Sequence, residues 1–166
     1  MLKKIISGGQ TGADRAALDV AIKMGIPHGG WIPKGRRTEK GYLPNKYRLQ
    51  EMPDGNYAKR TVKNVIASGA TLIFSHGKLS GGSEFTRIVA EKYKRPCLHV
   101  DLNLRSDLRA ARMIKDWIIR CNIEVLNVAG PRESNDPDIY AATVNVLQTA
   151  LSGVKKRQYP THRIKK

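Results

Sequence analysis

The chain has 166 residues, of which 40% are hydrophobic and 27% are charged. These values are typical of one globular domain and exclude a disordered chain. No apolar run approaches the roughly 20 residues that a membrane-spanning helix needs. The first residues, MLKKIISGG, lack the apolar stretch of a signal peptide. We therefore expect a cytoplasmic protein with a single ligand-binding domain over residues 1–153.

The net charge is +16, from 30 basic and 14 acidic residues. Basic residues gather at 33–48 and in a C-terminal tail, 154–166, which we expect to be flexible. This balance favours an anionic partner, either a phosphorylated small molecule or nucleic acid, although a basic surface with no such role would look the same. Aromatic residues make up only 6% and are not interleaved with the basic ones, which disfavours a stacking surface for single strands.

Short apolar runs alternate with helical patterns along the chain. The runs predict strands at 3–7, 29–33, 70–75, 97–101 and 124–128, and the helical patterns predict helices at 14–24, 56–68, 83–94, 106–121 and 138–151. Residues 38–54 are rich in glycine, proline, asparagine and charge, and predict a long loop. The alternation predicts an α/β fold, a Rossmann-like three-layer sandwich with a mostly parallel sheet of about five strands. Cys97 and Cys121 are expected to be buried free thiols.

Three of the predicted strands lead into loops of unusual composition. They are 7–15 (SGGQTGADR), 75–86 (SHGKLSGGSEFT) and 127–135 (NVAGPRESN). Because the carboxyl ends of parallel strands meet at one edge of a sheet, we expect these loops to converge where such folds bind ligands.

The composition of these loops suits an anion such as phosphate. Glycines let the backbone approach an anion closely, and the helix that follows offers unpaired N–H groups and partial positive charge. Side-chain donors and cations would complete the site; Arg36 could add charge and Trp31 could stack on a heterocycle. We predict that the ligand is bound by Gly8, Gly9, Gln10, Thr11, Gly12, Asp14, Arg15, Lys34, Gly81, Gly82, Ser83, Glu84, Thr86, Gly130 and Arg132.

Each of these features also has a purely structural interpretation, which the sequence leaves open. The first loop could be a tight turn, with Asp14 as an ordinary acid at a helix start. Ser83 could be a helix cap, Arg132 an exposed loop cation, and Trp31 a core residue.

The sequence offers little that points to a metal or a catalytic centre. The four histidines have no HxxxH or HxH spacing, and His76 is expected to be an ordinary loop histidine. There is no GxSxG elbow, and no pair of acids can be assigned to general acid and base roles. We predict no metal site and no catalytic residues.

The loop sequences also resemble those of a known family. SGGQTGADRAALD at 7–19, GGSEFT at 81–86 and LNVAGPRES at 126–134 resemble three motifs of the molybdenum carrier protein family, and WIPKGRR at 31–37 is similar to a fourth segment. The resemblance spans about residues 3–152.

That family is similar to a larger Rossmann-like superfamily, of which it is a circularly permuted relative. The superfamily includes molybdenum-cofactor carriers, cytokinin-activating phosphoribohydrolases once named lysine decarboxylases, and sensors of nucleotide-derived ligands. The resemblance implies a phosphorylated ligand, namely molybdopterin, the molybdenum cofactor or a nucleotide. It also implies a homo-oligomer, a dimer or a tetramer.

One departure from the relatives bears on catalysis. The hydrolases carry a GGxGTxxE pattern whose glutamate takes part in the reaction, whereas here Thr86 comes one position late and Val89 stands three residues after it. This favours a binding protein over an enzyme. A nucleoside-monophosphate phosphoribohydrolase that uses Glu84 is the alternative, and a basic nucleic-acid-associated protein is a second one.

Overall fold

A computed structural model of the chain describes residues 1–152; the predicted tail, 154–166, lies outside the described residues. Its main sheet has five parallel strands in the order β2-β1-β9-β7-β8. The strands are β1 (Lys4–Ile6), β2 (His28–Gly29), β7 (Ala70–Ser75), β8 (Cys97–Asp101) and β9 (Val125–Ala129). The predicted Rossmann-like sandwich, with its mostly parallel five-stranded sheet, is confirmed.

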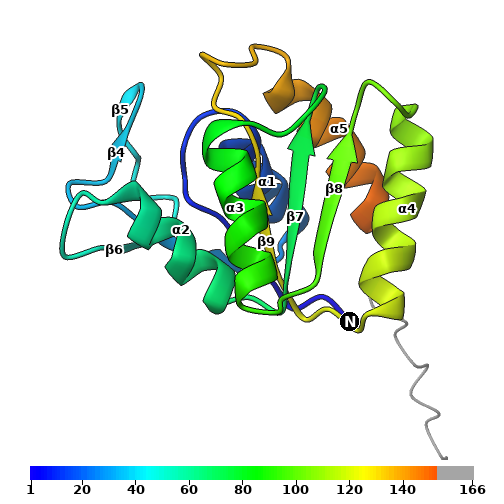
Figure 1. Cartoon of the computed structure of the whole chain (residues 1–166), viewed down its shortest axis with the longest axis horizontal. Coiled ribbons are helices and arrows are strands. Elements are labelled where there is room, and N and C mark those ends of the chain that lie inside the picture. The colour runs from blue at the N-terminus through cyan, green and yellow to red at the C-terminus, as the bar shows by residue number, and fades with distance from the viewer. Residues whose placement is uncertain (153–166) are drawn as a thin grey trace, which may run out of the picture.

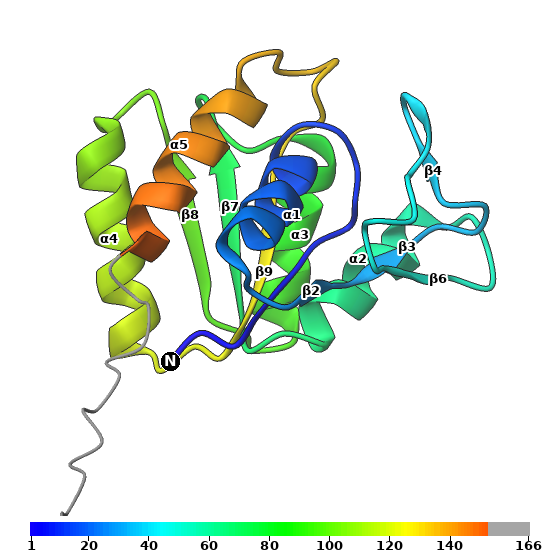
Figure 2. The same ribbon diagram turned by 180° about the vertical axis from the view of Figure 1, so that it is seen from behind.

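Five helices cover the two faces of this sheet (Figures 1 and 2). They are α1 (Ala13–Met24), α2 (Tyr57–Ile66), α3 (Gly81–Lys92), α4 (Asp107–Arg120) and α5 (Ile139–Ser152). Helices α2 and α3 lie on one face, and α1, α5 and α4 lie on the other. No helix within residues 1–152 has the length and apolar character required to cross a membrane.

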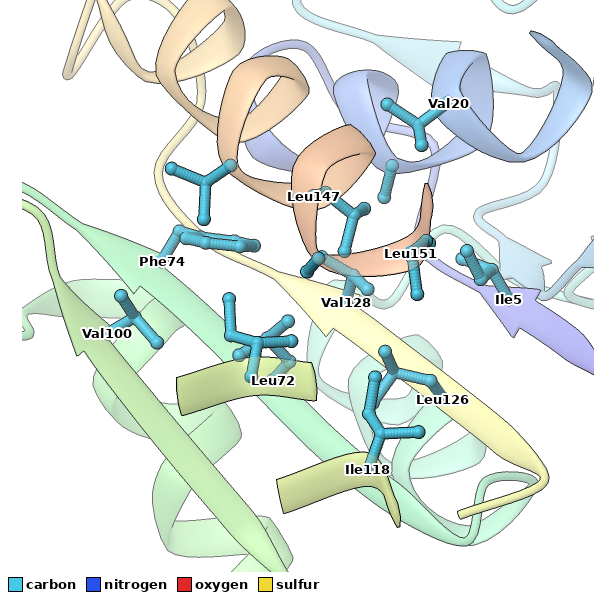
Figure 3. Close-up of a cluster of buried hydrophobic side chains, with 14 of the residues drawn as sticks. Ile5, Val20, Leu72, Phe74, Val100, Ile118, Leu126, Val128, Leu147 and Leu151 are labelled. Atoms are coloured by element: carbon cyan, nitrogen blue, oxygen red, sulfur yellow. The ribbon is translucent and has the colours of Figure 1, made fainter. Parts of the chain in front are cut away.

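The main core lies between the sheet and the layer of α1, α4 and α5 (Figure 3). Phe74 and Leu72 of β7 and Leu126 of β9 are fully buried there, against Leu147 of α5 and Ile118 of α4. Strand β7 is buried along its whole length, as expected of a central parallel strand with helices on both faces. This packing fixes the ends of the strands, from which the site is built.

The segment predicted as a strand at 29–33 divides at Gly30, whose φ of 125° turns the chain out of the main sheet. Its second part, β3 (Trp31–Ile32), instead pairs in parallel with β6 (Gln50–Glu51). Strands β4 (Arg37–Thr38) and β5 (Gly41–Tyr42) form a separate antiparallel hairpin. The prediction of one long loop over 38–54 was therefore wrong. The segment from β3 to β6, residues 31–51, carries strands of its own outside the main sheet, and we call it the excursion.

A small hydrophobic cluster and one arginine order this excursion. Leu43, Tyr47 and Leu49 are buried against Leu18 of α1. The Arg36 guanidinium, itself buried, donates hydrogen bonds of 2.7–3.2 Å to four backbone carbonyls within residues 43–49. The hypothesis that Arg36 neutralises a ligand is wrong, since the excursion uses its donors.

The two cysteines are less buried than expected. Cys97 begins β8 and is half-buried, and Cys121 is exposed. Cys121 follows the last residue of α4, where the chain turns away from the core. Ile118 and Ile123 pack inward on either side of it, while the side chain of Cys121 does not.

Candidate ligand-binding site

A cavity of about 420 Å³ lies at the carboxyl edge of the main sheet. Its wall comes from the first turns of α2 and α3, the loop between β7 and α3, and the loop after β9, and Gln10 and Asp14 also contribute to it. All three glycine-rich loops therefore reach the cavity, but they contribute unequally.

The first loop is largely closed by the protein's own acceptors. The N–H of Gln10 donates to the Asp14 carboxylate (3.4 Å), and that of Thr11 donates to the Gln10 side-chain oxygen (3.0 Å). The first N–H of α1, from Ala13, donates to the Pro131 carbonyl (3.2 Å). The carboxylate of Asp14 thus takes the place at this helix terminus that a bound anion would otherwise take.

Asp14 is buried, and among residues 1–152 its charged partner is Arg60 of α2. Arg60 Nη1 lies 3.6 Å from Asp14 Oδ2, and the two side chains are 14% and 6% exposed. Burial raises the pKa of Asp14, and the positive charge of Arg60 opposes that rise. A side chain on Gly8 would overlap the Arg60 guanidinium, so the glycine makes room for this pair.

Most other residues of the first loop serve the fold rather than the cavity wall. Gly9 packs against Leu43 and Leu49 of the excursion, and Gly12 lies against the carbonyl of Pro131. Arg15 donates to the Gly9 carbonyl (3.4 Å) and lies over the Tyr47 ring. The residues predicted to bind the ligand that do not line the cavity are Gly8, Gly9, Thr11, Gly12, Arg15, Lys34 and Glu84.

Glu39, at the tip of the hairpin, ties the first loop to the third. Its carboxylate accepts hydrogen bonds from the hydroxyls of Thr11 and Ser134 and from the N–H of Ser134 (3.1 Å). The Thr11 hydroxyl also accepts from the N–H of Glu133 (3.1 Å). Although burial acts to raise it, these hydrogen bonds hold the pKa of Glu39 below its ordinary value. We call this set of contacts the Glu39 latch.

The second loop presents an open helix terminus to the cavity. Gly81, Gly82 and Ser83 form the first turn of α3 and line the cavity. The Ser80 side chain does not cap the helix, and a Cβ on Gly81 or Gly82 would have no neighbour within 4 Å. The N–H groups of Gly81 and Gly82 have no acceptor within residues 1–152, whereas those of Ser83 and Glu84 donate to the Ser80 carbonyl (3.2 and 3.3 Å). Ser83 and Thr86, both buried, stand beside this opening.

Two positions of α3 bear on catalysis: Glu84, and Val89, which stands where the hydrolases have a glutamate. Neither lines the cavity. Glu84 forms a bidentate pair with Arg87, with N···O distances of 2.6–3.2 Å. Hydrogen bonding to Arg87 lowers the pKa of Glu84. Val89 is buried in a small cluster with Val65 and Ala90, between α3 and α2. Neither position supplies the cavity with a carboxylate.

The third loop contributes Gly130, Arg132 and Asp136 to the wall. Arg132 is exposed, and its side chain makes no hydrogen bond or ion pair within the described part of the chain. Asp136 Oδ2 lies 2.8 Å from His76 Nδ1, and its other oxygen accepts from the N–H of Asp138 (3.2 Å). This pair joins the second and third loops across the rim.

The sequence did not single out several residues of the wall. Tyr57 and Arg60 come from α2, and Lys78 comes from the second loop. The sequence did contain a signal for Tyr57 and Arg60. Asn56 is a helix cap, an aromatic residue follows it directly, and a cation stands three residues after the aromatic residue, on the same side of the helix. Trp31 and Lys34, by contrast, are absent from the wall; the Lys63 ammonium lies 4.0 Å from the Trp31 ring centroid.

The charged groups of the wall are mainly cationic. Three cations line it, Arg60, Lys78 and Arg132. The two acids of the wall are each next to a partner: Asp14 lies near Arg60, and Asp136 is paired with His76. Within residues 1–152, no three histidine, cysteine or acidic side chains gather in a way that could hold a metal ion. The arrangement can hold an anion by a helix terminus, hydroxyls and guanidinium groups.

Comparisons with known proteins agree with this architecture. The sequence matches none of the functionally curated proteins. A crystal structure at 1.45 Å of a protein from Syntrophus aciditrophicus SB, named "Putative molybdenum carrier protein", is 58% identical and superposes with a TM-score of 0.89, over 90% of this chain and 95% of that one. The profile of the circularly permutated YpsA SLOG family matches residues 5–151. The resemblance found in the three loop motifs is thereby confirmed, and the chain belongs to the circularly permutated YpsA SLOG family.

Proposed function

We propose that this chain is a binding protein for a phosphorylated, nucleotide-derived small molecule, with the molybdenum cofactor as one candidate, and that the cavity at the carboxyl edge is its site. The observation that carries the proposal is the open first turn of α3. It lines the cavity with no side-chain cap, and within residues 1–152 a Cβ on Gly82 would meet nothing within 4 Å beyond its chain neighbours and the backbone of its own helix.

The surroundings of this helix terminus support an anion rather than a neutral group. The first turn of α3 presents N–H groups and partial positive charge, as phosphate-binding helices do. Arg132 also lines the cavity, and its planar guanidinium suits the oxygens of phosphate. Ser83 brings a hydroxyl group to the same place, whereas the Thr86 hydroxyl donates to the Gly82 carbonyl (2.8 Å).

The contrast between α1 and α3 supports placing the proposed anion at α3 rather than at α1. At α1 the protein supplies its own carboxylate, Asp14, which accepts a hydrogen bond from the N–H of Gln10. At α3 the acid of the first turn, Glu84, is paired with Arg87 instead. The N–H groups of Gly81 and Gly82, which have no acceptor within the described residues, therefore remain available for an external anion.

The name of the 58% identical protein supports a molybdenum species among the candidates. Molybdopterin carries a phosphate group that the start of α3 could bind, and molybdate is itself an oxyanion. The cavity volume of about 420 Å³ lies within the range of small-molecule sites.

Isothermal titration calorimetry with the purified chain tests the proposal. The probes are ribose 5-phosphate, AMP, molybdate and molybdopterin. We expect at least one phosphorylated probe to bind with a Kd in the micromolar range, and Arg132→Ala to weaken that binding about tenfold. Lys34→Ala is the matched control, because Lys34 is an exposed cation outside the cavity wall. Absence of binding by every probe at high micromolar concentration would refute the proposal.

The phosphoribohydrolase alternative can be tested in the same samples. It requires a carboxylate at the bond that is cleaved, and Glu84 is paired with Arg87 outside the wall. We expect AMP to be recovered intact after prolonged incubation. Release of adenine that Glu84→Gln abolishes would establish the enzyme instead.

A homo-oligomer also remains part of the proposal. Leu108 and Ile119 of α4 are 64% and 61% exposed, and because eleven residues make about three helical turns they lie on the same side of α4, which is the candidate interface. Light scattering coupled to gel filtration should give a mass of two or four chains. A mass of one chain at micromolar concentration would contradict this expectation.

A further inference from the structure

Two aromatic side chains stand exposed in the wall of the cavity. Tyr57 is the first residue of α2 and is 42% exposed, and Phe85 lies in the second turn of α3 and is 36% exposed. Both line the cavity, together with Leu79 and Ala58. Helices α2 and α3 lie side by side on the same face of the sheet (Figure 1), so the two rings come from neighbouring helices.

The fold does not account for the position of these rings. The hydrophobic cluster between α2 and α3 consists of Val65, Val89 and Ala90, with Val62 and Cys97 packed against it, and it includes neither aromatic ring. An exposed apolar side chain on its own needs no explanation, but two aromatic rings in the wall of one cavity are typical of a binding site.

The cavity therefore has two chemically different parts. Gly82, Ser83 and Arg132 form a polar, cationic part that suits an anion. Tyr57 and Phe85 supply the aromatic part, and the Arg60 guanidinium lies 5.7 Å from the Tyr57 ring centroid. A ligand that fills both parts must carry an anionic group and a flat apolar group.

The spacing along α3 sets the distance between these two groups. Phe85 comes four residues after Gly81, which corresponds to about 6 Å of helix rise. A single sugar, or a side chain of similar length, spans about this distance between a phosphate and a heterocycle. An inorganic anion alone would leave the aromatic part of the cavity unused.

We infer that Tyr57 and Phe85 hold the planar heterocycle of a ligand whose phosphate lies at the start of α3, so that the ligand is a purine nucleotide or a compound with a similar bicyclic ring. This inference rests on the proposed function and adds the ring-binding residues to it. Stacking on an aromatic side chain contributes about 1–3 kcal/mol per base, which corresponds to roughly 5- to 150-fold in affinity.

Calorimetry with four probes separates the two parts of the cavity. The probes are inorganic phosphate, ribose 5-phosphate and two purine nucleotides, AMP and GMP. We expect the wild-type chain to bind AMP or GMP at least about fivefold more tightly than ribose 5-phosphate, because only the nucleotides reach the aromatic part.

Substitutions identify the source of that difference. Tyr57→Ala and Phe85→Ala should each weaken purine nucleotide binding about fivefold or more and leave ribose 5-phosphate binding unchanged. Tyr57→Phe and Phe85→Tyr should retain the affinity, because they keep the rings. Tyr93→Ala is the control, since Tyr93 is equally exposed, at 42%, but lies at the far end of α3.

The outcomes distinguish the two proposals. If ribose 5-phosphate binds but AMP and GMP bind no better, the inference about the rings is overturned and the anion site stands. The same holds if Tyr57→Ala and Phe85→Ala weaken ribose 5-phosphate and the nucleotides equally, which would indicate a structural role. If none of these probes binds, and neither molybdate nor molybdopterin does, the proposed function itself fails.

Discussion

Arg60 of α2 reaches over Gly8 to within 3.6 Å of the buried carboxylate of Asp14 in α1. This pair connects the two helix layers at the floor of the cavity. It also explains why the first loop, whose glycines resemble those of a phosphate-binding loop, is closed by the protein itself.

A double-mutant cycle should reveal strong coupling between these residues. Arg60→Met leaves Asp14 buried beside no cation, and we expect it to lower the free energy of unfolding by about 3–5 kcal/mol. Asp14→Asn should also destabilise, and the double variant should be less destabilised than the sum of the two by about 0.5–3 kcal/mol. Urea denaturation followed by circular dichroism measures all four proteins; additive losses would contradict a direct interaction.

The free energy of unfolding should depend on pH through the titration of Asp14. Because burial raises the pKa of this carboxyl in the folded state, the folded chain holds its proton more tightly than the unfolded chain does. The contribution of the protonated Asp14 carboxyl to the free energy of unfolding is therefore fully present below the ordinary pKa of 3.8, and it is lost as pH rises through the raised pKa of the folded state. The difference in unfolding free energy between wild type and Asp14→Asn should fall as pH rises above about 4. A difference that rises over this interval would refute the assignment.

Gly8 and Gly82 should respond in opposite ways to alanine. Gly8→Ala forces the new Cβ into the Arg60 guanidinium, so we expect a loss of about 1–3 kcal/mol in unfolding free energy. Gly82→Ala meets no neighbour and should leave the stability unchanged or raise it by up to about 1 kcal/mol. If the anion approaches the backbone at α3, Gly82→Ala should nevertheless weaken phosphate binding severalfold. Thermal melts and calorimetry on the two variants give both readouts.

Arg36 and Arg37 are adjacent arginines of which only the first is buried, so the same substitution at each tests how Arg36 stabilises the excursion. Arg36→Lys removes the fork that serves four carbonyls, and each buried carbonyl left without a donor costs about 1–3 kcal/mol. Arg37 is exposed, so Arg37→Lys should change stability by less than about 0.5 kcal/mol. Hydrogen exchange should become faster over residues 37–51 in the first variant alone. Equal effects of the two substitutions would contradict the structural role of Arg36.

The main sheet could be predicted because its determinants are local. Runs such as ATLIFS at 70–75 are apolar throughout and separated by amphipathic helices, which is enough to specify parallel strands. The excursion could not be predicted in the same way. Its strands are two residues long, and its order depends on Arg36 contacts that reach 7–13 residues along the chain.

The sequence predicted which edge of the sheet carries the candidate site, but not which of the two helix starts is open to the cavity. Two helix starts with similar glycine content differ because Asp14 turns back onto its own loop, whereas Glu84 pairs with Arg87. Both acids lie in a first helical turn, so composition alone cannot separate them. Arg60 and Tyr57 were missed because their place in the wall depends on how α2 packs beside α3.

The hydrogen bond from the Ser7 hydroxyl to the Val128 carbonyl, 2.6 Å long, joins residues 121 positions apart. Strand β1 lies between β2 and β9, and the Glu39 latch joins Thr11 to Ser134. A chain emerging from the ribosome therefore lacks a neighbour for one side of its first strand until nearly all of the domain has been synthesised. The cavity is completed among the last steps of folding, so a chain truncated before β9 would expose the edge of β1 and have no third loop with which to bind.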